Sequence, residues 1–87
     1  LKNIKNNINF INFINDFINI IDDIEPFESS FIESYINKIL KEKNILLKEI
    51  AQPLRYLLTG KYVSPGLFIL IELLGKEKTK KRISIIL

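Results

Sequence analysis

Apolar side chains recur at steps of three and four residues along most of this 87-residue chain, and that spacing constrains the fold more than any other feature. It is the period of helices that bury one face, whereas half-buried strands need strict alternation. The first such stripe comprises Phe10, Ile11, Ile14, Phe17, Ile18, Ile21 and Ile24. Asparagines and an aspartate occupy the other side, so the spacing predicts an opening amphipathic helix.

Proline, asparagine and glycine residues divide the middle of the chain into further helices. Pro26, followed by Glu28, predicts the start of a second helix, and Asn44 predicts its left-handed cap. A short third helical segment then reaches Pro53, which either kinks it or starts a new turn. That turn is expected to end at Gly60, the usual residue for a left-handed cap.

Two more helices complete the pattern. Ser64 and Pro65 form an N-cap and first-position pair, and the helix that they open runs to Gly75. Because its side chains are apolar almost all round, we expect this helix at the buried centre. A last helix starts with lysines and ends in apolar residues. The sequence predicts an all-α fold, a compact bundle of five or six short helices in a single domain spanning residues 1–87, with residues 1–9 as a flexible start.

The composition excludes several classes of site. The chain has no cysteine and no histidine, which removes disulfides, thiolate metal sites and the commonest general base. It also has no glycine-rich phosphate loop and no nucleophile elbow. Asp22 and Asp23 are adjacent, but carboxylates at a helix end point in different directions and are better explained by capping than by acid/base work. We expect no catalytic residue, metal or cofactor in this chain.

Charge and hydropathy limit which partners and which cellular location are expected. A net charge of +3 permits a polyanionic partner without identifying one. No stretch approaches the roughly 18 to 20 apolar residues of a membrane span, and the asparagine-rich start is unlike a signal peptide. We expect no membrane partner and a cytoplasmic protein, with an organelle matrix as the other option. Because the chain begins without methionine and contains none, we also expect a fragment of a longer chain.

Two polar clusters are candidates for a binding surface. Helical spacing puts one on a single side of the segment around the second proline: Lys48, Gln52, Arg55 and Thr59. This cluster could form hydrogen bonds with phosphates or with base edges. A surface arginine that caps a neighbouring helix is the commoner explanation. The other is a basic run near the end: Lys78, Lys80, Lys81 and Arg82. A solvated face and nucleic-acid contact both explain it.

A resemblance to a known family rests on the run QPLRYLLTGKYVSPGLF and on LLGKE and KRI further along. These motifs resemble the C-terminal anticodon-binding domain of bacterial-type glutamyl-tRNA synthetases. In that family a proline, an arginine, a Thr-Gly, a Ser/Thr-Pro, an apolar helix, a Gly-Lys and a final arginine follow in this order. The similarity is specific over residues 52–82 and looser over residues 10–43.

The resemblance implies an all-helical module of a class I aminoacyl-tRNA synthetase, the C-terminal part of a chain whose catalytic domain lies upstream. The parent would be an ATP-dependent glutamate–tRNA ligase that uses ATP and Mg²⁺. This fragment lacks the catalytic motifs and would, as a monomer, bind the anticodon loop of the tRNA for glutamate and position the tRNA. The alternative from another class is a stand-alone helical protein-interaction module.

The resemblance also implies site residues by position. The expected RNA-binding residues are Arg55, Thr59, Lys61, Tyr62, Ser64, Pro65 and Leu67. Arg55 matches the family arginine near the anticodon, and the helix start from Ser64 to Leu67 matches the part that contacts the anticodon bases, particularly the third. Tyr62, in the preceding loop, can stack on a base, although no family residue corresponds to it. Lys61 and Lys80 would contact phosphates without sequence preference.

Overall fold

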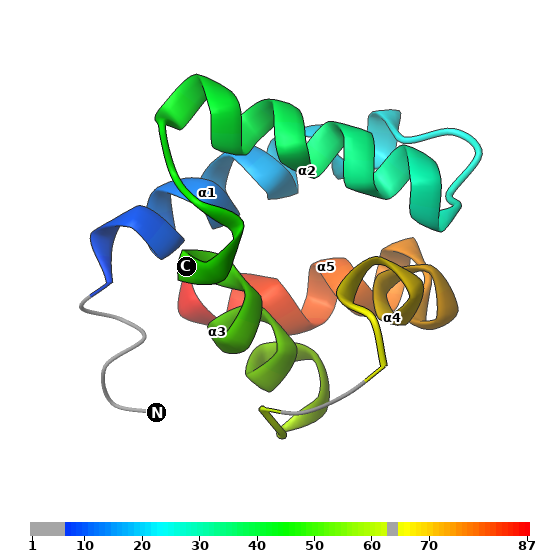
Figure 1. Cartoon of the computed structure of the whole chain (residues 1–87). Coiled ribbons are helices and arrows are strands. Elements are labelled where there is room, and N and C mark those ends of the chain that lie inside the picture. Colours follow the sequence, from blue (N-terminus) through cyan, green and yellow to red (C-terminus); the bar gives the residue numbers. More distant parts are fainter. Residues whose placement is uncertain (1–6, 63–64) are drawn as a thin grey trace.

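The computed structural model describes residues 7–62 and 65–87 as a bundle of helices. Five α-helices occur in the order α1 (Ile8–Ile20), α2 (Ser29–Lys43), α3 (Leu47–Thr59), α4 (Leu67–Leu74) and α5 (Lys76–Ile83), with 3₁₀-helices η1 (Ile21–Asp23) and η2 (Ser84–Ile86). No strand occurs in these two stretches. α2 packs on α1 and α4, while α5 contacts α1, α3 and α4 (Figure 1). The all-α bundle that the apolar spacing predicts is confirmed.

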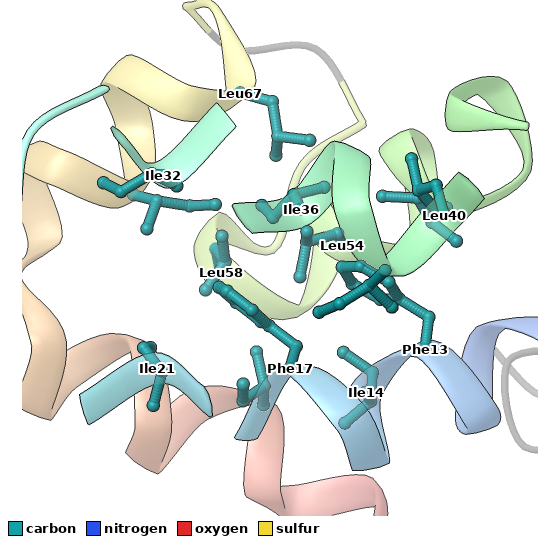
Figure 2. Packing of buried hydrophobic residues seen from close by; sticks show 14 of the residues in the cluster. Phe13, Ile14, Phe17, Ile21, Ile32, Ile36, Leu40, Leu54, Leu58 and Leu67 are labelled. Carbon is teal, nitrogen blue, oxygen red and sulfur yellow. The ribbon is translucent and has the colours of Figure 1, made fainter. Parts of the chain in front are cut away.

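The hydrophobic core lies where α1 meets α2 and α3. Phe13 and Phe17 of α1 stack with their ring centroids 5.5 Å apart. Figure 2 shows Phe17 pointing toward Leu58 of α3 and Phe13 toward Leu54, with Ile36 of α2 above them. All five side chains are buried. Phe13 is missing from the expected stripe, although it lies three residues after Phe10 and four before Phe17 and so shares their buried face.

α1 also starts earlier than expected. Ile8 and Asn9 belong to this helix, and the flexibility expected of residues 1–9 stays a prediction. The side chain of Asn7 accepts a hydrogen bond from the Phe10 backbone N–H, which caps the helix. Residues 1–6 of the predicted flexible start lie outside the described residues.

α2 begins at Ser29, and the expected start at Pro26 is wrong. Glu28 is extended (φ −122°, ψ 155°), so the preceding residues do not join the helix. The Ser29 backbone N–H donates to Oε1 of Glu72 in α4 at 2.6 Å, and this carboxylate stabilises the positive end of the helix dipole. At the other end Asn44 is left-handed (φ 56°, ψ 46°), as predicted.

α4 begins later than predicted. Its N-cap is Gly66, whose backbone has φ −45° and ψ 138°, and its first residue is Leu67. Pro65 is therefore not the first helical residue, because the extended glycine separates it from the helix. Ser64, the predicted N-cap, lies outside the described residues.

α4 is not the buried centre of the domain. Leu67 and Leu70 face the core, but Ile69 is 52% and Leu73 is 74% exposed. Its neighbours α2, α3 and α5 cover one side of the helix, and Figure 1 shows it at the edge of the bundle. An apolar composition does not determine which side of a helix its neighbours cover, and α1 supplies the centre of the core instead.

Candidate nucleic-acid interface

α3 carries the predicted polar face on one continuous helix. Pro53 lies inside it, although proline removes a backbone donor and commonly kinks or ends a helix. Ile50, Leu54 and Leu58, on both sides of the proline, are buried together. Burial of this stripe keeps the two halves in one helix, which ends at left-handed Gly60 as predicted (φ 77°).

Arg55 lies on the polar face, and one nitrogen of its guanidinium has no hydrogen-bond partner among the described residues. Lys48 and Gln52, nearer the start of α3, are exposed, whereas Arg55 is half-buried. The Nε atom of Arg55 is buried and has no hydrogen-bond partner. Among the described residues no carboxylate forms an ion pair with this guanidinium. Arg55 is therefore not the helix-capping arginine of the commoner explanation.

Thr59 shapes the turn that follows α3. Its hydroxyl lies 2.8 Å from the carbonyl oxygen of Arg55, to which it donates. The hydroxyl oxygen of Thr59 in turn accepts a hydrogen bond from the backbone N–H of Lys61 at 3.0 Å. Thr59 therefore holds the backbone of Lys61 against the end of α3. A direct contact between Thr59 and RNA stays a prediction.

Tyr62 forms an aromatic pair with Tyr56 across this turn. The two ring centroids are 5.2 Å apart with an interplanar angle of 29°. Tyr62 is 40% exposed, so part of its ring is open to solvent beside the exposed Lys61. The sequence analysis did not include Tyr56 among the site residues. The presence of an aromatic residue on each side of the Thr-Gly turn could have indicated this pair.

The predicted residues after the turn divide into buried and exposed groups. Leu67 is only 4% exposed and packs in the core, so its side chain is not available for a base to stack on. Pro65 and Gly66 are exposed. The structure thus brings Arg55 and Tyr62 to the end of α3 and does not present Leu67 as an apolar platform.

Two lysines of α5, Lys76 and Lys80, form ion pairs with acidic residues elsewhere in the fold. Lys80 donates to both carboxylate oxygens of Asp22 in η1, each at 3.0 Å. These hydrogen bonds hold the pKa of Lys80 above its ordinary value. Lys76 pairs with Glu25 at 2.6 Å. Lys80 thus joins α5 to η1, and its expected contact with phosphate stays a prediction.

Arg82 has the capping role that the sequence alternative gave to Arg55. Its Nη1 donates to the carbonyl oxygen of Leu58, in the last turn of α3. A cation at a helix C-terminus satisfies open carbonyl groups and complements the helix dipole. Arg82 therefore joins α5 to the end of α3 that carries the polar face.

Two kinds of feature are missing from the described parts of the chain. Residues 7–62 and 65–87 contain no cluster of three or more acidic, histidine or cysteine side chains arranged to hold a metal ion. No helix in these ranges has the length and apolar character needed to cross a membrane.

The fold and this surface define a small all-helical domain. Around one helix end it presents an arginine with no ion-pair partner among the described residues, a partly exposed aromatic ring and several cations. A family model described as an anticodon binding domain matches residues 2–87. The chain belongs to this family.

Similar proteins include glutamate–tRNA ligases from several bacteria. The chain is 46% identical over 66 residues to glutamate–tRNA ligase 2 of Thermosipho melanesiensis, covering 76% of this chain and 14% of that protein. It is 43% identical over 60 residues to the glutamate–tRNA ligase of Thermodesulfovibrio yellowstonii, covering 69% and 13%. For glutamate–tRNA ligase 2 of Rickettsia conorii the identity is 33% over 69 residues, covering 79% and 14%. The chain thus matches only a small part of each relative, and no solved structure gives a significant match.

Proposed function

We propose that this chain recognises the anticodon loop of a glutamate tRNA, as the anticodon-binding part of a glutamate–tRNA ligase. The family match supports anticodon recognition, and the names of the similar ligases support glutamate as the amino acid. The observation that carries the site is the half-buried Arg55 near the end of α3, whose guanidinium has no ion-pair partner and whose Nε has no hydrogen-bond partner among the described residues. The family match favours this function over a stand-alone protein-interaction module.

The chemistry of an anticodon loop fits this surface. Proteins read loop bases that are unstacked, by hydrogen bonds to their edges and by stacking on aromatic rings. Arg55 supplies a planar set of donors suited to base acceptors. Tyr62, already held by Tyr56, supplies a ring 40% open to solvent. The exposed Pro65 and Gly66 lead into the backbone N–H groups of α4, which suit a base carbonyl or a phosphate.

The proposal also covers the rest of the parent protein. A catalytic domain upstream in the same chain would attach glutamate with ATP and Mg²⁺, while the present domain positions the tRNA. The match of this chain to about 14% of the Thermosipho ligase supports such a division. We place the parent ligase in the cytoplasm and this domain in a monomer.

Substitution of Arg55 tests the proposal. We expect Arg55→Ala to weaken binding to a glutamate-tRNA anticodon stem–loop by about 1 to 3 kcal/mol, the range for a good base contact. Arg55→Lys keeps the charge but loses the planar set of donors, so it should recover little of the loss. Fluorescence anisotropy with labelled RNA gives the affinities, and circular dichroism checks the helix content.

A matched control uses a lysine outside the interface. Lys41 is exposed on α2, and Lys41→Ala removes one charge without touching α3. We expect it to weaken binding slightly and equally for any RNA. An Arg55→Ala chain that stays folded and binds no worse than Lys41→Ala would contradict the proposed role of Arg55.

A further inference from the structure

We propose that Lys78, Lys81 and Arg82 form a pocket that binds phosphate groups of the RNA backbone without reading the sequence. The proposal rests on the proposed function for the identity of the polyanion. It does not depend on base recognition at Arg55. It gives the chain a second contact with the same RNA.

The pocket has the chemistry that a phosphodiester requires. Its volume is about 540 Å³, and its lining residues are Lys78, Lys81, Arg82, Ser84 and Ile85. Three cations and a hydroxyl line it, and no acidic side chain does. Lysine and arginine are the usual phosphate ligands. The Ser84 hydroxyl donates to the Lys81 carbonyl oxygen at 2.9 Å, so the cations rather than the hydroxyl supply the donors. The lining thus favours an anion with several acceptor oxygens.

The pairing pattern of α5 separates these cations from their neighbours. Lys76 and Lys80, one helical turn apart, pair with Glu25 and Asp22. Lys78 and Lys81 are exposed, and neither forms an ion pair with a described residue. Residues three and four apart share a helix face, so Lys78 shares a face with Lys81 and with Arg82. α5 therefore neutralises one face within the fold and leaves another face charged.

Arg82 places the pocket next to the candidate interface. Its bond to the Leu58 carbonyl oxygen ties one wall of the pocket to the last turn of α3. That turn leads through Gly60 to Lys61 and Tyr62. A guanidinium has five N–H donors, and this bond uses one of them. An RNA loop bound at the end of α3 would bring its neighbouring backbone phosphates within reach of the pocket.

Salt dependence is the property that this pocket should control. Each phosphate that a cation neutralises releases condensed counterions, so the logarithm of affinity falls linearly with the logarithm of salt concentration. Removing one phosphate contact reduces that slope by about 1 and weakens binding to every sequence alike. A base contact lacks this signature because it discriminates between sequences.

The test replaces Lys78 and Lys81 in the 87-residue chain. The pocket variant is Lys78→Gln with Lys81→Gln, and glutamine forms helices about as well as lysine. Its matched control is Lys38→Gln with Lys41→Gln, two exposed lysines of α2 with the same spacing and the same charge change. Affinity for the anticodon stem–loop is measured by anisotropy between about 50 and 200 mM KCl.

We expect the pocket variant to reduce the salt slope by about 2, one unit per lysine, and the control to change it much less. The loss of affinity at low salt should be the same factor for a stem–loop whose third anticodon base is replaced. Equal salt slopes for the pocket variant and the control would overturn the pocket, because positive charge anywhere on the surface would then explain the salt dependence.

Two further comparisons distinguish failure of the pocket from failure of the anticodon function. If replacing the third base weakens wild-type binding while the pocket variant behaves like the control, the pocket fails and the anticodon function stands. If the pocket variant loses affinity while base replacement has no effect, the pocket stands and the anticodon function fails. Inorganic phosphate, added at constant ionic strength, should not displace the RNA. Displacement at low phosphate concentration would assign the pocket to a small phosphate ligand and overturn the proposal.

Discussion

Glu49 shows how much one side chain does at the start of α3. Its Oε2 accepts the Leu46 backbone N–H at 2.7 Å, and its Oε1 accepts the side-chain amide of Asn9 at 3.1 Å. The bond from Leu46, and then the bond from Asn9, hold the pKa of Glu49 below its ordinary value of 4.5. One carboxylate thus satisfies an open backbone group at the helix start and joins α1 to α3.

These bonds predict an acid-dependent stability. A carboxyl group whose pKa is lower in the folded state stabilises the fold above its unfolded pKa, and the contribution is lost as pH falls through the folded pKa. Below the ordinary value of 4.5 the wild-type chain should therefore lose stability, and Glu49→Gln should lose less over the same range. Urea unfolding midpoints at neutral and acid pH measure the difference. Glu33→Gln, an exposed change on α2, is the control. An identical acid response in Glu49→Gln and wild type would contradict this role.

Single residues of the site were partly predictable from the sequence. Helical spacing correctly placed Arg55 on the polar face of α3. The hydroxyl of Thr59 forms hydrogen bonds that shape the turn after α3, and the guanidinium of Arg82 caps the end of that helix. Helical spacing does not reveal either role. The burial of Leu67 depends on neighbouring helices, so a local pattern could not distinguish it from an exposed platform.

The half-buried state of α4 leads to a prediction about this helix. Leu70 is 8% exposed and Leu73 is 74% exposed on the same helix. Leu70→Ala should cost about 2 to 5 kcal/mol of unfolding free energy, because it removes buried methyl groups and leaves a cavity. Leu73→Ala should stay within about 0.5 kcal/mol of wild type. Urea unfolding of both variants measures the pair, and similar losses would show that α4 is buried all round.

The ends of the helices were harder to predict than their existence. Asn44 and Gly60 were correctly predicted as left-handed caps because their preference is local. Pro26 and Pro65 were wrong as first helical residues, since extended residues after each delay the helix. Pro53 lies within α3 because the buried stripe on both sides of it outweighs a missing donor. Tertiary packing decides these cases.

In the whole molecule, Arg55 of α3 and the pocket lined by Lys78, Lys81 and Arg82 both lie near the end of α3. α5 contacts both α1 and α3, and its pairs with Asp22 and Glu25 link it to the segment after α1. These pairs join residues that are 51 and 58 positions apart in sequence, so local spacing did not predict them. The basic run was recognisable in the sequence, but its division into a paired face and a free face required the fold.

The central claim is that the end of α3 reads an anticodon. The most direct measurement is an NMR titration of the isotope-labelled chain with a glutamate-tRNA anticodon stem–loop, beside one whose third anticodon base is replaced. We predict shifts at Arg55, Tyr62 and Gly66 that weaken with the altered base. Identical shifts with both RNAs, confined to the lysines of α5, would contradict the claim.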